Sequence, residues 1–169
     1  MDMREKPHRS DLIIEKWRGL RTEQLEVHFT GDLSVEIASC CMEFATLDRV
    51  LYNLVNNAIR HGEGSAVEMY MLPDQAAKPE HLFLGVKNKM SDTGKAGLME
   101  RFGSNWSELF RSGYTTGGSG FELSICADCV SRAYQVHTFE ALVAGRYLGA
   151  EARGDAFLAW VFWPLMSAG

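Results

Sequence analysis

The segment that most constrains the fold is residues 46–61, which carry the clearest helical pattern of the chain. Its apolar side chains recur at helical spacing and are expected to form one stripe that faces the core: Leu47, Val50, Leu51, Leu54 and Ala58. Thr46 can cap this helix, and Asp48 is favourable in the first turn. Gly62 and Gly64 are expected to end it, so the sequence predicts a helix over residues 46–61.

Strand-like segments lie on both sides of this helix. They are rich in apolar residues and bounded by turn residues: 25–29, 34–44, 66–72 and 81–88. A second helix is expected over residues 120–134, and residues 145–163 predict a closing hairpin around Gly154-Asp155. This order differs from parallel βαβ alternation. It predicts an α+β fold, a two-layer α/β sandwich in which a mixed sheet has helices on one face.

Three other segments are less regular. Residues 89–119 are rich in Gly, Ser, Thr, Asn and Lys, and so long a segment with little patterning predicts a functional loop or lid. Residues 136–145 are longer than the usual connection from a helix to a strand. Residues 1–24 are polar and predict a lead-in or linker, so the domain itself is expected to span residues 25–169.

Composition and charge narrow the class of protein. A chain of 169 residues fits one domain, and 46% hydrophobic with 23% charged residues is ordinary for a soluble globular protein. The net charge of −5 argues against nucleic acid and against direct contact with an anionic membrane. No apolar run is long enough to span a bilayer or to form a signal peptide, so a cytoplasmic location is expected.

Two asparagines distinguish the helix over residues 46–61. Asn53 and Asn57 are four residues apart, so they share one helix face beside the apolar stripe. An amide oxygen can ligate a hard cation such as Mg²⁺. Arg60 and His61, one turn further on, can meet a phosphate. Taken alone, these residues fit a solvated polar face equally well.

A glycine-rich stretch precedes the second predicted helix. Thr115 and Thr116 are followed by Gly118 and Gly120. Glycines let backbone N–H groups approach an anion closely, and the start of a helix adds a favourable dipole. A flexible surface loop is the other interpretation of this stretch taken by itself.

Together, and in this order, the two segments resemble the N box and the combined F and G2 boxes of the GHKL ATPases, in the form found in sensor histidine kinases. The matching residues are Asn53-Leu54-x-x-Asn57-Ala58, then Phe110, Thr115-Thr116 and Gly118-x-Gly120-Phe121-x-Leu123. The resemblance covers about residues 25–165, and Phe162-Trp163-Pro164-Leu165 is similar to the last strand of these domains. It implies the Bergerat (GHKL) form of the two-layer sandwich.

The resemblance also implies a function. The chain would be the ATP-binding catalytic domain of a two-component sensor histidine kinase, with ATP and Mg²⁺ as cofactors. It would donate the γ-phosphate to a histidine on a helical dimerisation hairpin outside this sequence, and a response regulator would be the next partner. The domain would be an enzyme as part of that kinase and need not be active in isolation.

Site residues follow from the same motif positions. Asn57 would hold Mg²⁺, and Asn53 would lie beside it near the phosphates. Arg60 and His61 would lie near the phosphates and the nucleotide. Asn88 falls where the family has the Asp that reads the adenine amino group. The lid and the phosphate-facing helix start would include the remaining positions, Thr115, Thr116, Gly118 and Gly120.

The sequence departs from the family pattern at the adenine-reading G1 box, D-x-G-x-G. Asn88 replaces the Asp, and Met90 stands where the first Gly is expected. Asp92 and Gly94 offer an alternative register, shifted by four residues, which would lengthen the preceding strand. Glu122 replaces a Gly of the G2 box, and a carboxylate near a triphosphate is unfavourable unless it points away or reaches metal.

These departures leave two further functions open. A degenerate GHKL domain that acts as a protein-binding or regulatory module without ATP turnover is favoured by Asn88, Met90 and Glu122. A serine kinase of the anti-sigma-factor type uses the same fold without the hairpin, and the short N-terminal segment permits it.

Two other groups of residues are interpreted as structural. The Cys126-x-x-Cys129 pair is expected in the core rather than in a zinc site, because no second cysteine pair has suitable spacing. The aromatic residues of the closing hairpin are expected as its core and edge and not as a stacking platform for bases: Tyr147, Phe157, Trp160, Phe162 and Trp163.

Overall fold

The computed structural model describes the backbone over most of the chain. The described residues are 8–9, 26–30, 36–37, 44–61, 66–75, 80–103, 105–112 and 122–165. Within these segments, the side chains described are those of residues 46–59, 67–75, 80–103, 105–111 and 123–165. No helix in these segments is long and apolar enough to cross a bilayer.

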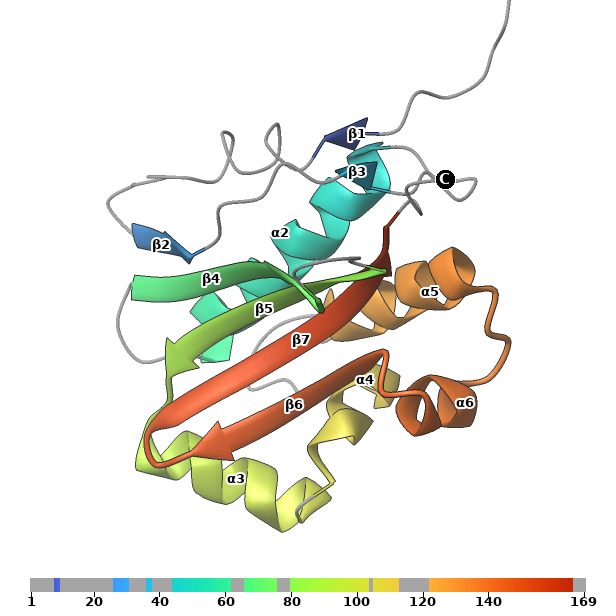
Figure 1. The fold of residues 1–169 in the computed structure, drawn as a ribbon. Helices are drawn as coiled ribbons and strands as arrows, with labels where there is room; N and C mark the ends of the chain where they lie inside the picture. Colours follow the sequence, from blue (N-terminus) through green and yellow to red (C-terminus); the bar gives the residue numbers. More distant parts are fainter. Residues whose placement is uncertain are drawn as a thin grey trace, which may run out of the picture.

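One five-stranded sheet forms the first layer of the domain (Figure 1). Its strands, in spatial order, are β2 (Glu26–Thr30), β4 (Ala66–Pro73), β5 (His81–Lys89), β7 (Ala156–Pro164) and β6 (Leu148–Arg153). β2 runs parallel to β4, and every other neighbouring pair is antiparallel. The mixed sheet predicted from the order of elements is therefore confirmed. A separate short pair joins β1 (His8–Arg9) to β3 (Glu36–Ile37). β3 lies within residues 34–44, which were predicted as one longer strand.

The alternation of buried and half-buried side chains along the central strands shows which face of the sheet the second layer covers. On β7 the buried residues are Phe157, Ala159, Val161 and Trp163, and the residues between them are only half-buried. A period of two is expected when one face of a strand is covered and the other is not. The helices α2 (Phe44–His61) and α5 (Glu122–Tyr134) supply the cover, since α2 contacts β5 and α5 contacts β7.

Helix α2 carries the predicted stripe. All five apolar positions are at most 3% exposed: Leu47, Val50, Leu51, Leu54 and Ala58. This stripe faces α5, where the Cys126 thiol donates to the Val50 carbonyl at 3.5 Å. The helix ends at His61 as predicted, but it begins at Phe44, so the prediction that Thr46 caps it is wrong. Nothing in Phe44-Ala45 resists a helical backbone, so the first turn starts before Thr46.

The prediction of a long irregular loop over residues 89–119 is also wrong where the structure describes it. The segment contains α3 (Asp92–Phe102), a 3₁₀ turn η1 (Trp106–Glu108) and α4 (Leu109–Ser112). The Ser91 hydroxyl accepts from the Gly94 N–H at 3.0 Å and caps α3. Only Leu98 of α3 is buried, so the helix lacks the apolar stripe by which sequence periodicity finds a helix.

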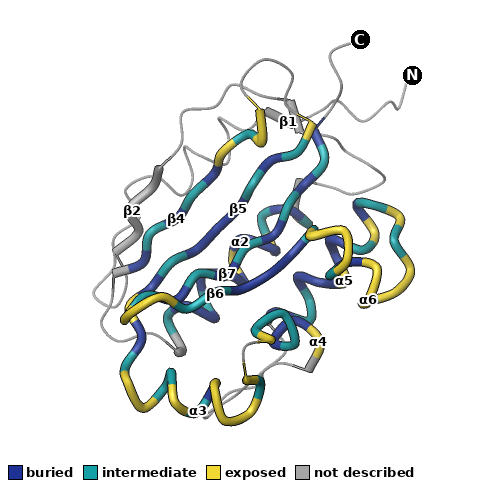
Figure 2. Tube along the Cα trace, turned by 60° about the horizontal axis from the view of Figure 1, so that its bottom comes forward, coloured by how far each residue is buried: buried dark blue, intermediate teal, exposed yellow. Residues whose placement is uncertain are grey.

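The C-terminal part matches the predicted hairpin. β6 and β7 pair in antiparallel register, and Gly154 in their turn has φ 58°, which glycine adopts without strain. The connection before β6 contains the short helix α6 (Phe139–Ala144), capped by Thr138, whose hydroxyl accepts from the Ala141 N–H at 3.2 Å. Figure 2 shows buried residues along the strands and exposed ones along α3.

Candidate functional site

The two asparagines of α2 are buried rather than solvated. Asn53 is 8% and Asn57 is 7% exposed, beside a stripe that is fully covered. The Asn53 Nδ2 donates to the Arg49 carbonyl at 2.8 Å, which uses the nitrogen of that amide and not its oxygen. The Asn57 side chain has no hydrogen-bond partner among the described residues. The interpretation as a solvated polar face therefore does not hold for either residue.

Asn88 is the second residue from the end of β5, on the face that the helices cover. It is 5% exposed and pairs in register with Val67 of β4 and Phe157 of β7. Its Nδ2 donates to the Lys89 carbonyl at 3.1 Å. Its Oδ1 is buried and has no donor in the described part of the chain. A buried acceptor without a donor costs about 1–3 kcal/mol, so this oxygen is a candidate contact for a ligand N–H.

Burial around Met90 and the start of α3 bears on the two registers considered for the G1 box. Met90 is 3% exposed and its N–H donates to the Asp155 carbonyl at 2.6 Å, which ties the end of β5 to the β6–β7 turn. Asp92 is exposed and begins α3, and Gly94 lies within that helix. A base-reading carboxylate needs a sheltered position, so burial favours Asn88 over Asp92.

The structure places some of the predicted site residues and not others. The backbone of Arg60 and His61 forms the last turn of α2, and their side chains lie outside the described residues. Glu122 begins α5 with its side chain likewise outside them. The lid positions Thr115, Thr116, Gly118 and Gly120 lie outside the described residues altogether. Asn53 and Asn57 lie on α2 and Asn88 lies on β5, and these two elements contact each other.

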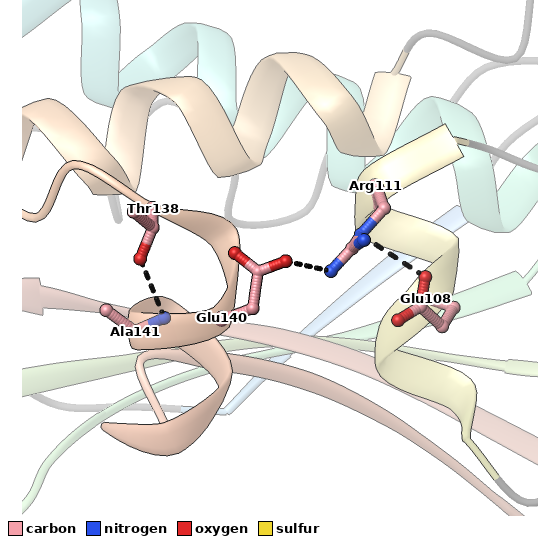
Figure 3. Close-up of polar contacts among 5 residues, drawn as sticks. All are labelled: Glu108, Arg111, Thr138, Glu140 and Ala141. Atoms are coloured by element: carbon pink, nitrogen blue, oxygen red, sulfur yellow. Dashed lines mark hydrogen bonds and ion pairs between the residues drawn. The ribbon is translucent and has the colours of Figure 1, made fainter.

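Sequence reasoning missed a charged cluster formed by side chains of η1, α4 and α6. Arg111 of α4 donates through Nη2 to Glu140 Oε1 of α6 at 2.8 Å, and its Nε lies 3.4 Å from Glu108 Oε2 (Figure 3). Its guanidinium carbon also lies 4.6 Å from the ring centroid of Phe139. The (i, i+3) pair of Glu108 and Arg111 was readable from the sequence. The contact with Glu140 was not, because 29 residues separate the two.

The pKa of one side chain in this cluster, Glu140, is shifted. The pKa of Glu140 lies below its ordinary value because its own backbone N–H and the positive charge of Arg111 both favour the carboxylate. All three charged side chains are substantially exposed to solvent. Ion pairs between exposed side chains contribute little, so we expect the cluster to add little to the free energy of unfolding.

The cysteines of α5 behave as core residues, as predicted. Cys126 and Cys129 are buried at 0% and 6% exposure. Burial raises the pKa of the Cys129 thiol, which disfavours the reactive thiolate. Among the described residues no group of three His, Cys, Asp or Glu side chains is arranged to hold a metal ion.

Comparison with known proteins identifies the fold through structure. No protein-family model and no curated protein sequence matches the chain. The crystal structure of a histidine kinase from Burkholderia phymatum STM815 matches with a TM-score of 0.51 and 12% identity, over 96% of this chain and 72% of that one. The chain has the fold of a histidine kinase. The predicted two-layer α+β architecture is therefore confirmed.

Two further structures are similar to the chain. Full-length ShkA in complex with AMPPNP gives a TM-score of 0.53 at 14% identity, over 86% of this chain and 26% of that chain. The chain thus spans about a quarter of ShkA, at 26% of its length. The histidine kinase domain of the E. coli osmosensor EnvZ gives a TM-score of 0.46 at 16% identity, over 97% and 92% of the two chains.

Proposed function

We propose that this chain is the ATP-binding catalytic domain of a two-component sensor histidine kinase. It binds ATP with Mg²⁺ and presents the γ-phosphate to a histidine on a helical dimerisation hairpin, from which a response regulator takes the phosphoryl group. A domain with this role works in the cytoplasm. The observation that carries the proposal is the unpaired, buried Oδ1 of Asn88, a residue that the motif resemblance aligns with the adenine-reading Asp.

The chemistry of Asn88 suits an adenine. Its amide oxygen accepts from the exocyclic amino group of the base, and that contact removes the cost of leaving the oxygen unpaired. The bond from Nδ2 to the Lys89 carbonyl keeps the nitrogen occupied, so the oxygen is the group left for the ligand. A neutral amide forms a weaker hydrogen bond than a carboxylate, so we expect weaker binding than an Asp at this position would give.

The asparagines of α2 suit the phosphates and their cation. The Asn57 amide is buried without a described partner, and an amide oxygen is a ligand that Mg²⁺ accepts. Mg²⁺ neutralises the negative charge of the phosphates when it is bound. Asn53 lies one turn away, near the phosphates. Arg60 and His61 follow at the end of the same helix, and we assign them to the phosphate side of the nucleotide.

The glycine-rich stretch completes the proposed site. Thr115, Thr116, Gly118 and Gly120 supply hydroxyls and backbone N–H groups to the phosphates before α5 begins. Phosphoryl transfer then depends on positioning and charge neutralisation, and no residue of this domain acts as a nucleophile. The nucleotide analogue in the ShkA complex supports this assignment of the fold to ATP binding.

Calorimetric titration of the chain with ATP and Mg²⁺ tests the proposal. We expect a saturable heat and a rise in melting temperature, both of which require the cation. Asn57→Ala should weaken binding of the Mg²⁺ complex by about 10- to 100-fold, as expected for loss of one contact to a charged group. Tyr52→Ala is the matched control, because Tyr52 lies on the same helix with its side chain 57% exposed.

One alternative function has an observation in its favour. Met90, in place of the glycine that gives room for the base, is buried in the core at 3% exposure. A degenerate domain that binds a partner protein without turning over ATP would be expected to fill its base pocket in this way. Absence of both heat and thermal shift at millimolar ATP with Mg²⁺ would remove the basis of the kinase proposal and favour this alternative.

A further inference from the structure

The peptide unit between Lys89 and Met90 makes a hydrogen bond on each of its two sides. On one side, the Met90 N–H donates to the Asp155 carbonyl in the β6–β7 turn at 2.6 Å. On the other side, the Lys89 carbonyl accepts from Asn88 Nδ2 at 3.1 Å. A trans peptide unit is planar and directs its N–H and C=O to opposite sides. The two hydrogen bonds are therefore coupled through one rigid group.

The β6–β7 turn is itself tied to the end of β5 and to α3. Lys95 of α3 donates through Nζ to the Gly154 carbonyl at 3.0 Å, and Lys89 Nζ lies 4.0 Å from Asp155 Oδ2. Gly154 has φ 58°, a left-handed conformation that β-branched residues very rarely adopt. A Cβ built at Gly154 would meet no described atom within 4 Å. The turn therefore depends at this position on the backbone freedom of glycine and not on the space around it.

This arrangement decides which end of the Asn88 amide is left for a ligand. The Lys89 carbonyl is an acceptor, so it selects the nitrogen of the amide. The amide oxygen is left, buried and without a donor among the described residues. A flipped amide would set this oxygen against the Lys89 carbonyl, and two facing acceptors repel each other. The flip costs little only if the peptide unit rotates too, and the bond from Met90 to Asp155 opposes that rotation.

We infer that the β6–β7 turn is a specificity-determining element of the nucleotide site, an inference that rests on the function proposed above. With its oxygen toward the ligand, Asn88 accepts from the amino group at C6 of adenine. A 6-oxo purine carries a carbonyl oxygen at C6, which this orientation repels and a flipped amide would bind. By holding the peptide unit between Lys89 and Met90, the turn keeps Asn88 selective for 6-amino over 6-oxo purines.

The dependence on the turn follows from the amide at position 88. A carboxylate has an oxygen at both ends, so it presents an acceptor to the ligand in either orientation. An amide has one acceptor end and one donor end, so its selectivity depends on how it is held. Asn88→Asp should therefore prefer 6-amino purines whether or not the turn is intact.

The affinities for ATP and for inosine triphosphate (ITP), each with Mg²⁺, test the inference. ITP carries the 6-oxo base that corresponds to adenine. Calorimetric titration of the full chain should show that the wild type prefers ATP by about 10-fold or more, the equivalent of one hydrogen bond. Gly154→Val should lower this preference by about 10-fold, since a β-branched residue opposes the left-handed conformation of the turn.

Gly103→Val is the matched control for the change in the turn. Gly103 ends α3 with φ 61°, and a Cβ built there also meets no described atom within 4 Å. The substitution and its backbone strain are the same, but Gly103 makes no bond to the peptide unit after Lys89 among the contacts described. The preference for ATP should therefore stay at the wild-type value.

A double-mutant cycle separates selectivity from folding. In Asn88→Asp, the further change Gly154→Val should leave the ratio of the two affinities unchanged. A wild type that binds ATP and ITP equally well would overturn the inference. So would a Gly154→Val variant in which both affinities fall together and their ratio is kept. A wild type that binds neither nucleotide would overturn the proposed function, and the inference with it.

Lys95→Met is a second variant, to be used if melting curves show that Gly154→Val does not fold. It removes the hydrogen bond from Lys95 to the Gly154 carbonyl and leaves the backbone of the turn unsubstituted. The preference for ATP over ITP should fall by about two- to fivefold, because one tie of the turn is lost. An unchanged ratio in a folded Lys95→Met variant would then count against the turn as the element that holds Asn88.

Discussion

The two faces of the sheet are built from the same strands but differ in what their residues contribute. On the inner face of β7, Trp163 and Val161 are at most 2% exposed and pack under the helices. On the outer face of the same strand, turned away from α2 and α5, Trp160 and Phe162 are partly exposed and contact other side chains of that face. The comparison shows that of two adjacent aromatic residues on a strand, one can be buried in the core while the other lies on the surface. The alternation of side chains along the strand decides which residue is buried.

The largest expected effect comes from truncating the inner face. Trp163→Ala should lower the free energy of unfolding by about 3–5 kcal/mol, because it leaves a cavity under the helices. Trp160→Ala, on the outer face, should cost much less, since its ring is already partly in contact with solvent. Urea denaturation of the two variants measures the difference. Equal losses would break the distinction between the faces.

A smaller effect tests whether the outer rings are held flat by glycine. Gly149→Ala places a Cβ against the Trp160 ring and should destabilise the fold by about 1–3 kcal/mol, as overpacking does. Combining it with Trp160→Ala should remove most of that cost, because the ring is then absent. A double-mutant cycle by chemical denaturation reads out the coupling, and strictly additive losses would contradict the proposed contact.

A third variant sharpens the contrast at Asn88, a polar position on the inner face of β5. Asn88→Leu removes the unpaired buried oxygen and should raise the free energy of unfolding by about 1 kcal/mol. The same change should abolish the thermal shift that ATP with Mg²⁺ produces in the wild type. A loss of stability in Asn88→Leu would show that the oxygen is paired in the folded protein. Val86→Leu, on the same face, controls for altered packing.

The smallest effect concerns the exposed cluster around Arg111. The pKa of Glu140 is lower in the folded chain than its ordinary value. The stability that this carboxylate contributes is therefore fully present at pH values above that ordinary pKa. It is lost as the pH falls through the lowered pKa of the folded state. Wild type and Arg111→Ala should therefore differ slightly in melting temperature near neutral pH and converge in acid. A difference that grows on acidification would contradict this sign.

Elements stabilised by periodic burial were predictable from the sequence, and elements defined by local caps were not. The apolar stripe of α2 and the β6–β7 hairpin were found because each shows its period within a short stretch. Helix α3 was missed because one buried residue, Leu98, gives no period, and its start depends on the single hydroxyl of Ser91. The helix start at Phe44 was missed for a related reason, since several residues there permit a helical turn.

The candidate site, too, was predictable from the sequence only in part. The sequence singled out Asn53, Asn57 and Asn88 from their spacing and from their place in a family pattern. The roles given to these residues, and to Arg60, His61 and the glycine-rich stretch, stay predictions. The structure added the burial of all three asparagines and the unpaired oxygen of Asn88. It also added the contact of Arg111 with Glu140, which joins residues far apart in the chain.

By itself, the sequence determined the order of the main strands and of helices α2 and α5, the helix that carries the asparagines and the class of the fold. These follow from local periodicity, which depends only on residues near one another in the chain. The tertiary structure alone decided which face of each strand is covered and which amide lacks a partner. Those properties depend on what other segments place beside a residue, because burial and hydrogen bonding are set by neighbours in space.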